Sequence, residues 1–329
     1  MRDLKGFIVV VILVAITYWG IEPLAHSVMH PHVPAANFDF AAGEYEQNLA
    51  KLSNLEMVVN EAKKGGDEKA IKAADDEYKK AESSVNEAQA FWNEVNKIDL
   101  SKGDAKRGEE AAAACLGCHN DAAITEMAAA DPGYASVPAN LNNIAYMYDE
   151  KFLAALFKDP VKAMRLSHKF GEERMFPMVT GYDDGMIADL VAYFKSIAPA
   201  QMEDKAVFEE ACARCHDMKY AGIKTPGATD MLKAYLGMTP PDLSMYIRSR
   251  DITYLHNFIN DPQKMLEGTA MPRVGLNEKA QNQVVAYMSK VGDSKKDERE
   301  SLGIKIMIYF VILSIFAILW KMFIWRNLH

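Results

Sequence analysis

The feature that most constrains the fold of this 329-residue chain is an internal repeat between about residues 99 and 290. Three pairs of similar segments carry it: FLAALFKDPVKAM (152–164) with YLHNFINDPQKML (254–266), PANL (138–141) with PPDL (240–243), and ADLVAYF (188–194) with NQVVAYM (282–288). The members of a pair lie 94 to 102 residues apart. Self-similarity at such a spacing predicts two consecutive domains of one fold, each about 95 residues long.

All four cysteines fall inside the repeat, as two Cys-x-x-Cys pairs: Cys115 with Cys118, and Cys212 with Cys215. Each pair is followed at once by a histidine, His119 or His216. In a helix, residues at i, i+3 and i+4 share one face, so both thiols and the imidazole can point the same way. Cys-x-x-Cys-His is the attachment pattern of c-type haem, whose vinyl groups bond the thiols while the histidine binds the iron. The pattern predicts two covalently attached haem c groups.

Zinc binding and thiol redox chemistry are the alternatives for these cysteines. Two Cys-x-x-Cys pairs can form a four-cysteine zinc site, and a thioredoxin-like redox site uses the same spacing. However, each pair here has its own histidine and its own repeat. A thioredoxin-like domain alternates strands with helices, whereas the segments around both pairs have a helical pattern. Haem attachment is therefore the preferred interpretation.

A hydrophobic segment lies near each end of the chain. Residues 7–20 carry no charge, and the apolar stretch extends to about residue 25, which is enough for an uncleaved membrane anchor. A cleaved signal peptide is the alternative, but no clear small-x-small site follows. The second segment covers residues 304–325. Basic residues flank both segments at their outer ends, so the positive-inside rule predicts cytoplasmic termini and haem domains in the periplasm of a bacterial inner membrane.

Residues 38–98 have the pattern of a helical hairpin. The second half repeats apolar positions at alternating spacings of three and four: Ile71, Ala74, Tyr78, Ala81, Val85, Ala88, Trp92 and Val95. The first half has a similar stripe: Tyr45, Leu49, Leu52 and Val59. Two apolar seams separated by Gly-Gly-Asp predict two antiparallel helices that face each other. The hairpin is expected to be either a spacer that packs on the rest of the chain or a docking element for partner subunits.

Each repeat resembles a class I cytochrome c domain. The resemblance rests on GDAKRGEEAAAACLGCH and FEEACARCH at the front, the Asp-Pro segment, a methionine loop, and DLVAYF or QVVAYM in the last helix. It implies an all-helical fold around each haem, with the iron between the motif histidine and a methionine late in the domain. We therefore expect an all-α chain with two tandem class I cytochrome c domains, an N-terminal helical hairpin and one transmembrane helix at each end. The expected parts are an anchor (1–25), a linker and hairpin (26–98), domain 1 (99–200), domain 2 (201–290), a charged linker (291–303) and a C-terminal transmembrane helix (304–329).

The resemblance also nominates the sixth iron ligands. TAMPRVGL has the family's Met-Pro loop, so Met271 is the expected ligand in the second domain. In the first domain, ERMFPMVTG offers Met175 and Met178. Pairing Met175 with Met271 gives an offset of 96 residues, between the 97 of the cysteines and the 94 of the last helix, whereas Met178 gives 93. Met175 is therefore preferred, and the alternatives are Met178, Met164 and His168.

A further family feature is a proline turn whose carbonyl accepts a hydrogen bond from the ligand histidine. Pro241 in PPDL occupies that place in the second domain and is the expected partner of His216. The first repeat has Ala139 there, with Pro138 one residue earlier, so the partner of His119 stays open.

Two protein ligands leave an iron without an open position for a substrate, which favours electron transfer over catalysis. A dihaem peroxidase would need one haem that opens, and two similar methionine loops disfavour it. The C-terminal helix after the haem domains resembles the cytochrome c subunit of quinol–cytochrome c reductases, the cytochrome bc complexes. A dihaem form with both anchors resembles the epsilonproteobacterial type.

This resemblance implies an electron-transfer subunit in a dimeric complex with cytochrome b and a Rieske iron–sulfur protein, embedded in membrane lipid. Its acceptor would be a soluble cytochrome c or a terminal oxidase. The formal net charge of −8 disfavours nucleic acid as a partner. The alternatives are the dihaem subunit of a haem-copper oxidase, in which membrane helices typically precede the haem domains, and a free-standing membrane-tethered carrier.

Overall fold

A computed structural model of the chain describes residues 2–29, 36–120, 124, 138–165, 182–226, 229–266 and 268–328. Within these residues every named element is a helix, and the only strand-like pairs are two isolated bridges, Tyr148 with Leu276 and Met218 with Ile223. The predicted all-α fold class is confirmed. The chain divides into two compact units, Met1–Ala36 and Asn37–His329, and each is described by itself.

The first unit is a nearly continuous helical segment. It consists of α1 (Arg2–Ile16), a π-helical turn (Thr17–Ile21) and α2 (Glu22–Met29). The stretch Leu4–Ile21, with a mean hydropathy of 2.2, is long and apolar enough to cross a membrane. Helix α18 (Lys296–Leu328), at the end of the second unit, passes the same test with a mean hydropathy of 2.5. Both helices are compatible with membrane anchoring.

The segment 291–303 differs from the linker that its charged sequence predicts. Helix α17 (Glu278–Gly292) ends inside it, and α18 already begins at Lys296. Arg299 in the first turns of α18 donates two hydrogen bonds to the Asp293 carboxylate, at 2.6 and 2.9 Å. This ion pair spans the short connection, and the many charged residues that follow are good helix formers.

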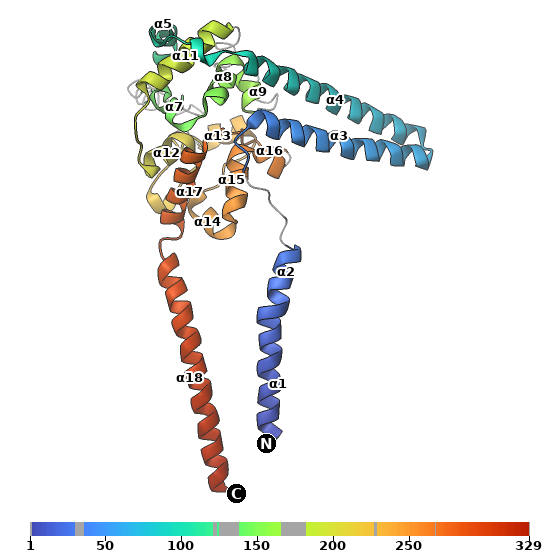
Figure 1. Cartoon of the computed structure of the whole chain (residues 1–329), viewed down its shortest axis with the longest axis vertical. Helices are drawn as coiled ribbons and strands as arrows, with labels where there is room; N and C mark the ends of the chain where they lie inside the picture. The colour runs from blue at the N-terminus through green and yellow to red at the C-terminus, as the bar shows by residue number, and fades with distance from the viewer. Residues whose placement is uncertain are drawn as a thin grey trace. The chain divides into compact units, whose positions relative to one another are not determined.

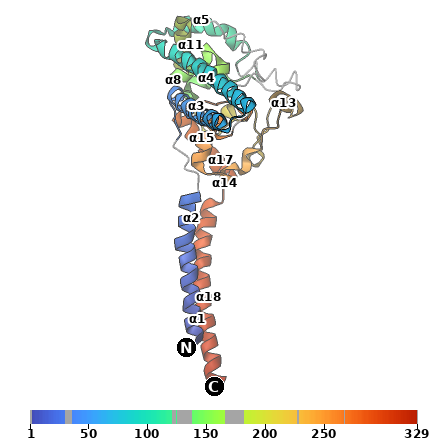
Figure 2. The same ribbon diagram turned by 90° about the vertical axis from the view of Figure 1, so that its right-hand side faces the viewer.

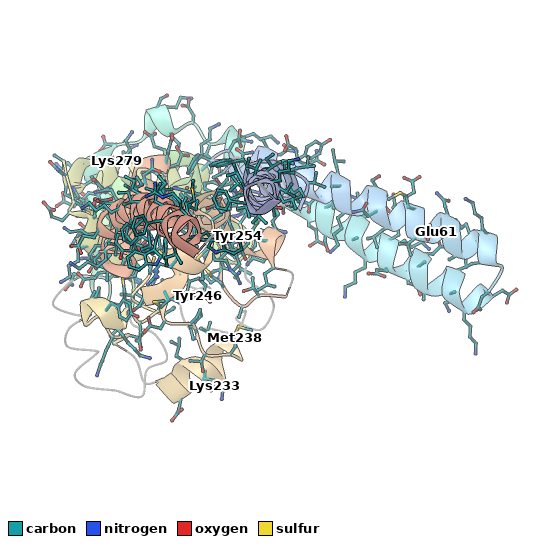
Figure 3. All side chains as sticks on the ribbon, turned by 90° about the horizontal axis from the view of Figure 1, so that it is seen from below. Glu61, Lys233, Met238, Tyr246, Tyr254 and Lys279 are labelled. Atoms are coloured by element: carbon teal, nitrogen blue, oxygen red, sulfur yellow. The ribbon has the colours of Figure 1, made fainter. Side chains whose placement is uncertain are left out.

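The predicted hairpin is present as α3 (Phe40–Gly65) and α4 (Glu68–Lys97), which lie side by side (Figures 1 and 2). Gly66 ends α3 in the left-handed conformation, at φ 71°, which glycine adopts without strain. The Asp67 side chain then caps α4 by accepting from the Lys69 amide. Glu61 lies near the far end of the hairpin (Figure 3). At the other end Phe40, Trp92 and Val95 enter the core of the first domain.

The inner stripe of α4 follows the predicted seam, but the predicted stripe of α3 is partly wrong. Tyr45 and Leu49 are 44% and 46% exposed. The inner side of α3 at this end is formed instead by Phe40, Glu44 and the half-buried Asn48. The spacing of hydrophobic residues does not predict this face because it includes the buried carboxylate of Glu44, whose partners Trp92 and Arg273 lie outside α3.

The first domain comprises α5 (Ala105–Leu116), α7 (Ile144–Met147), α8 (Glu150–Lys158), α9 (Pro160–Ala163) and α11 (Asp184–Ile197) among the described residues. Helices α5 and α11 cross so closely that a Cβ at Gly108 would lie 2.0 Å from the Asp189 carbonyl oxygen. At the same crossing Arg107 donates two hydrogen bonds of 2.7 Å to the Asp189 carboxylate. The small size of Gly108 and the Arg107–Asp189 ion pair therefore set the position of α5, the helix in which the first motif begins.

The second domain comprises α12 (Asp204–Ala211), α13 (Thr229–Leu236), α14 (Tyr246–Ser249), α15 (Ile252–Asn260), α16 (Pro262–Met265) and α17 in the described part of the chain. Helices α12 and α17 meet as α5 and α11 do, but the rings of Phe208 and Tyr287 pack there, 5.1 Å apart. Gln283, the counterpart of Asp189, donates to the Asp204 carboxylate at 3.0 Å. The two domains thus share a fold and differ in how the crossing is packed.

Candidate haem sites

Both Cys-x-x-Cys-His motifs adopt the same local turn. In the first, the amides of Cys118 and His119 donate to the Cys115 carbonyl, at 3.1 and 3.0 Å. In the second, the corresponding amides donate to the Cys212 carbonyl, at 3.1 and 2.9 Å. The first motif begins inside the last turn of α5, and the second begins at the residue that follows α12. Each of these helices crosses the last helix of its domain, and this crossing fixes the direction of the motif. The same spacing of cysteines and histidine thus gives the same backbone turn in both domains.

A backbone carbonyl orients each motif histidine. His119 Nδ1 lies 2.6 Å from the Ala139 oxygen, and His216 Nδ1 lies 2.8 Å from the Pro241 oxygen. Because a carbonyl only accepts, Nδ1 carries the proton in both neutral rings, and Nε2 is the nitrogen of the type that binds a metal. The partner of His119 in the first repeat is therefore Ala139. A backbone carbonyl at this place is enough to orient the histidine, and alanine provides one as well as proline does.

Burial lowers the pKa of both histidines. For His119, burial is the main cause, and the positive charge of Arg214 in the second domain adds to it. For His216, burial again dominates, opposed by the Pro241 hydrogen bond. A lowered pKa keeps each imidazole neutral to more acidic pH, and the neutral form is the one that binds a metal.

The four thiols are free and poorly suited to redox exchange. Burial raises the pKa of Cys212 to about 12 and also raises the pKa values of Cys115 and Cys215. Redox dithiols work through a lowered thiolate pKa, which is the opposite shift. Among the described residues, which include all four cysteines, no group of three or more His, Cys, Asp or Glu could hold a metal ion, so the pairs do not join in a zinc site. Two thiols and a histidine in each domain, with Nε2 as the ring nitrogen that does not carry the proton, fit a covalently attached haem.

The methionine ligands divide between described and undescribed segments. Met271 lies half-buried in the loop between α16 and α17, where its carbonyl accepts from Gln263 at 2.8 Å. Met175, Met178 and His168 lie outside the described residues. Met164 ends α9, and its carbonyl accepts from the Arg273 amide of the second domain. The assignment of Met175 and Met271 as iron ligands stays a prediction.

The two motif regions are joined across the domain interface. Asn140, next to the carbonyl that orients His119, donates to Glu210 at 3.5 Å, and Asn143 donates to the same oxygen at 3.1 Å. Glu210 precedes Cys212 by two residues in α12. These contacts could not be predicted from the sequence, because their partners are 67 and 70 residues apart and no periodicity links them.

Comparison with known families gives one clear match. The family model for cytochrome c matches residues 105–198 and 203–292, together more than half of the chain. Comparisons with curated proteins and with solved structures found no match of significance. The hairpin and both terminal apolar helices lie outside the matched spans. Because each span contains one complete Cys-x-x-Cys-His motif with the geometry described above, the chain belongs to the cytochrome c family and carries two covalently bound c-type haems.

Proposed function

We propose that this chain is the dihaem electron-transfer subunit of a respiratory quinol–cytochrome c reductase. In this role it accepts electrons from a Rieske iron–sulfur protein and relays them through two haems to a cytochrome c or a terminal oxidase. A c-type haem supplies one iron that accepts and releases a single electron. The residues of this chain attach the two haems and orient their histidines.

The contact between the two motif regions is the observation that carries the relay. The hydrogen bonds from Asn140 and Asn143 to Glu210 tie the histidine support of the first domain to the attachment helix of the second. The backbone continues this contact, since the Asn277 amide donates to the Met147 carbonyl at 2.8 Å. Two domains fixed in this way keep their cofactors at a constant separation, which supports passage of electrons within the chain instead of diffusion of a shuttle.

The apolar helices support a membrane-bound role. A helix at each end, α1 with its π-helical turn and α18, is long and apolar enough to cross the bilayer. Arg2 and Lys5 precede the first apolar run, and Lys321 and Arg326 lie at the end of the second. The positive-inside rule then gives cytoplasmic termini and haem domains on the periplasmic side, where a Rieske protein and a soluble cytochrome c are reached. Quinol oxidation belongs to the cytochrome b partner, and the complex is expected to be dimeric.

Co-purification tests this assignment. The tagged chain, solubilised from native membranes in mild detergent, is expected to bring down cytochrome b and Rieske polypeptides in equal amounts. Copper-containing oxidase subunits in their place would identify it as the dihaem subunit of a haem-copper oxidase. A chain that elutes alone after chemical crosslinking in the membrane would be a free-standing carrier. Either of these two outcomes overturns the proposal.

Ligand variants test the haem assignment separately. Met175→His and Met271→Leu are each expected to remove the methionine-ligated low-spin signature of one haem and to lower its reduction potential or open its sixth position. Met178→Leu is the matched control and should leave both potentials unchanged. Loss of the signature in Met178→Leu alone would move the assignment to Met178.

A further inference from the structure

The loop that carries Met271 packs against the first domain. The Arg273 amide donates to the Met164 carbonyl of the first domain at 2.9 Å. Gly275, in the left-handed conformation at φ 76°, lies so close to Phe152 that a Cβ would approach its ring to 1.9 Å. Because glycine lacks that Cβ, the loop can press its backbone against the other domain. The position of the Met271 loop is therefore set in part by residues outside its own domain.

Arg273 fastens the same loop through its side chain. This side chain is 1% exposed, and its Nη1 donates to Glu44 in the hairpin at 3.0 Å and to the Ala163 carbonyl at 3.5 Å. Its guanidinium also lies 5.6 Å from the centre of the Phe40 ring. A buried cation with no carboxylate partner is strongly unfavourable, so this position of the loop depends on Glu44.

Glu44 is itself held for this contact. It is 7% exposed, and the indole nitrogen of Trp92 in α4 donates to the same carboxylate oxygen at 2.9 Å. Thus α3 supplies the charge and α4 helps to orient it. The Arg273 Nε atom has no hydrogen-bond partner within the part of the chain that the structure describes. Loss of Glu44 would therefore remove the hydrogen bond of Arg273 to a carboxylate. Among the described residues it would leave Nη1 the Ala163 carbonyl at 3.5 Å and, for an ion pair, the more distant Asp261 at 3.9 Å.

A second set of contacts connects the loop to the end of α9. Gln263 donates to the Met271 carbonyl at 2.8 Å and to the Arg165 carbonyl at 3.3 Å. Arg165 in turn donates to Asp261 at 3.0 Å and to Gln47 of the hairpin at 2.6 Å. Gln263, in α16 of the second domain, binds the backbone of the loop directly, and its contact with the Arg165 carbonyl connects the methionine segment to the end of α9 and, through Gln47, to the hairpin.

We propose that Glu44 is a positioning residue for the second haem: acting through Arg273, it fixes the loop that presents Met271 to the iron. This inference rests on Met271 being the sixth ligand in the proposed function. It gives the hairpin, which lies outside both family matches, a definite task. The hairpin is the element that holds the methionine loop of domain 2 against domain 1.

Cyanide binding to the ferric, full-length, detergent-solubilised protein tests this role, because cyanide enters only when a methionine leaves its iron. Glu44→Gln keeps the shape of the side chain and removes its charge. We expect cyanide to bind one of the two haems about tenfold faster, which corresponds to a loop about 1.4 kcal/mol less stable. Glu46→Gln, on the exposed side of the same helix, is the matched control and should bind cyanide at the wild-type rate.

Two further variants separate positioning from general loosening of the hairpin. Trp92→Phe removes a donor to Glu44 but leaves the pair with Arg273, and is expected to stay within about twofold of the wild-type rate. Equal acceleration in Trp92→Phe and Glu44→Gln would overturn the proposal. If Glu44→Gln fails to load two haems, Glu44→Asp, which keeps the charge on a shorter side chain, should show the same acceleration to a smaller degree; an unchanged rate in Glu44→Asp would also overturn it.

Met271→Leu distinguishes this inference from the proposed ligand. It should open one haem to cyanide completely, and this effect should not depend on the contacts of the hairpin. If Met271→Leu opens a haem and neither Glu44 variant changes the rate, the positioning role is wrong and the ligand stands. If Met271→Leu changes nothing, the ligand assignment is wrong, and the inference falls with it. Amide hydrogen exchange at residues 268–277 provides an independent readout, with faster exchange expected in Glu44→Gln than in Glu46→Gln.

Discussion

The two cytochrome c domains hold their histidines in the same way but pack the crossing of their first and last helices differently. Both histidines donate to a backbone carbonyl, from Ala139 in one case and Pro241 in the other. At the crossing, Asp189 forms an ion pair in the first domain, where the second has the neutral Gln283. Contacts made by the backbone tolerate a change of side chain, whereas contacts made by side chains diverge between the copies.

The largest effect is expected from removing the thiols of one motif. Cys115→Ser combined with Cys118→Ser should leave a chain with one covalent haem instead of two, because serine forms no thioether with a vinyl group. Haem content per chain, measured from the absorbance of denatured protein, checks this. Cys212→Ser with Cys215→Ser is the mirror experiment on the other domain. Two covalent haems in either double variant would contradict the equivalence of the motifs.

The next effect tests the contact between the second domain's loop and the first domain. Gly275→Ala should destabilise the folded chain by about 3 kcal/mol or more, since left-handed strain costs ~1–2 kcal/mol and the overlap with Phe152 adds ~1–3 kcal/mol. Gly268→Ala is the matched control in the same loop, with φ 78° and nothing within 4 Å of its Cβ, and should show the strain alone. Thermal unfolding followed by circular dichroism measures both. Equal losses would show that the tight contact is not formed.

The two helix crossings should respond differently to acid, because an ion pair stabilises the first and a neutral glutamine occupies the second. Hydrogen bonds from Arg107, then from the Asp104 amide, hold the pKa of Asp189 below its ordinary value. A carboxyl with a lowered folded pKa stabilises the chain above its unfolded pKa of about 3.9, and that contribution is lost as pH falls through the lower folded value. Asp189→Asn should therefore lower the unfolding temperature at pH 7. In acid, the unfolding temperatures of the variant and of the wild type should lie closer together than at pH 7.

Gln283→Met makes the comparable change in the second domain, where the side chain donates one hydrogen bond to the Asp204 carboxylate and forms no ion pair. Its effect on the unfolding temperature should change less between about pH 7 and about pH 3.5 than the effect of Asp189→Asn, because a neutral donor stabilises a carboxylate less than a charged one does. If the gap in unfolding temperature between Gln283→Met and the wild type shrinks in acid as much as it does for Asp189→Asn, the ion pair does not account for the loss of stability of the first domain in acid.

The smallest effect is expected at the histidine support itself. Pro241→Ala copies the first domain into the second and keeps the carbonyl that accepts from His216. Only the stiffness of the unfolded chain changes, so stability should fall by about 0.4–1 kcal/mol. The visible spectrum and the potential of the haem should not change. A shifted spectrum would show that the proline ring, and not its carbonyl, is needed.

Much of the organisation followed from sequence because it rests on local rules. The repeat, the two attachment motifs and the hairpin break at residues 65–67 each depend on residues close together in the chain. The inner stripe of α4 was predictable for the same reason, since its apolar positions recur every three or four residues. The stripe of α3 was not, because Glu44 is buried by partners from α4 and the second domain.

The sequence by itself determined that this chain forms two helical haem domains, because covalent attachment requires two thiols and a histidine at one fixed spacing. It also determined the two apolar segments, through length and composition alone. Only the tertiary structure decided which side chains join the domains. Arg273, Glu44 and Gly275 matter through partners from distant parts of the chain. Such contacts leave no periodic pattern, since burial of a charge or close approach of a backbone depends on shape in three dimensions.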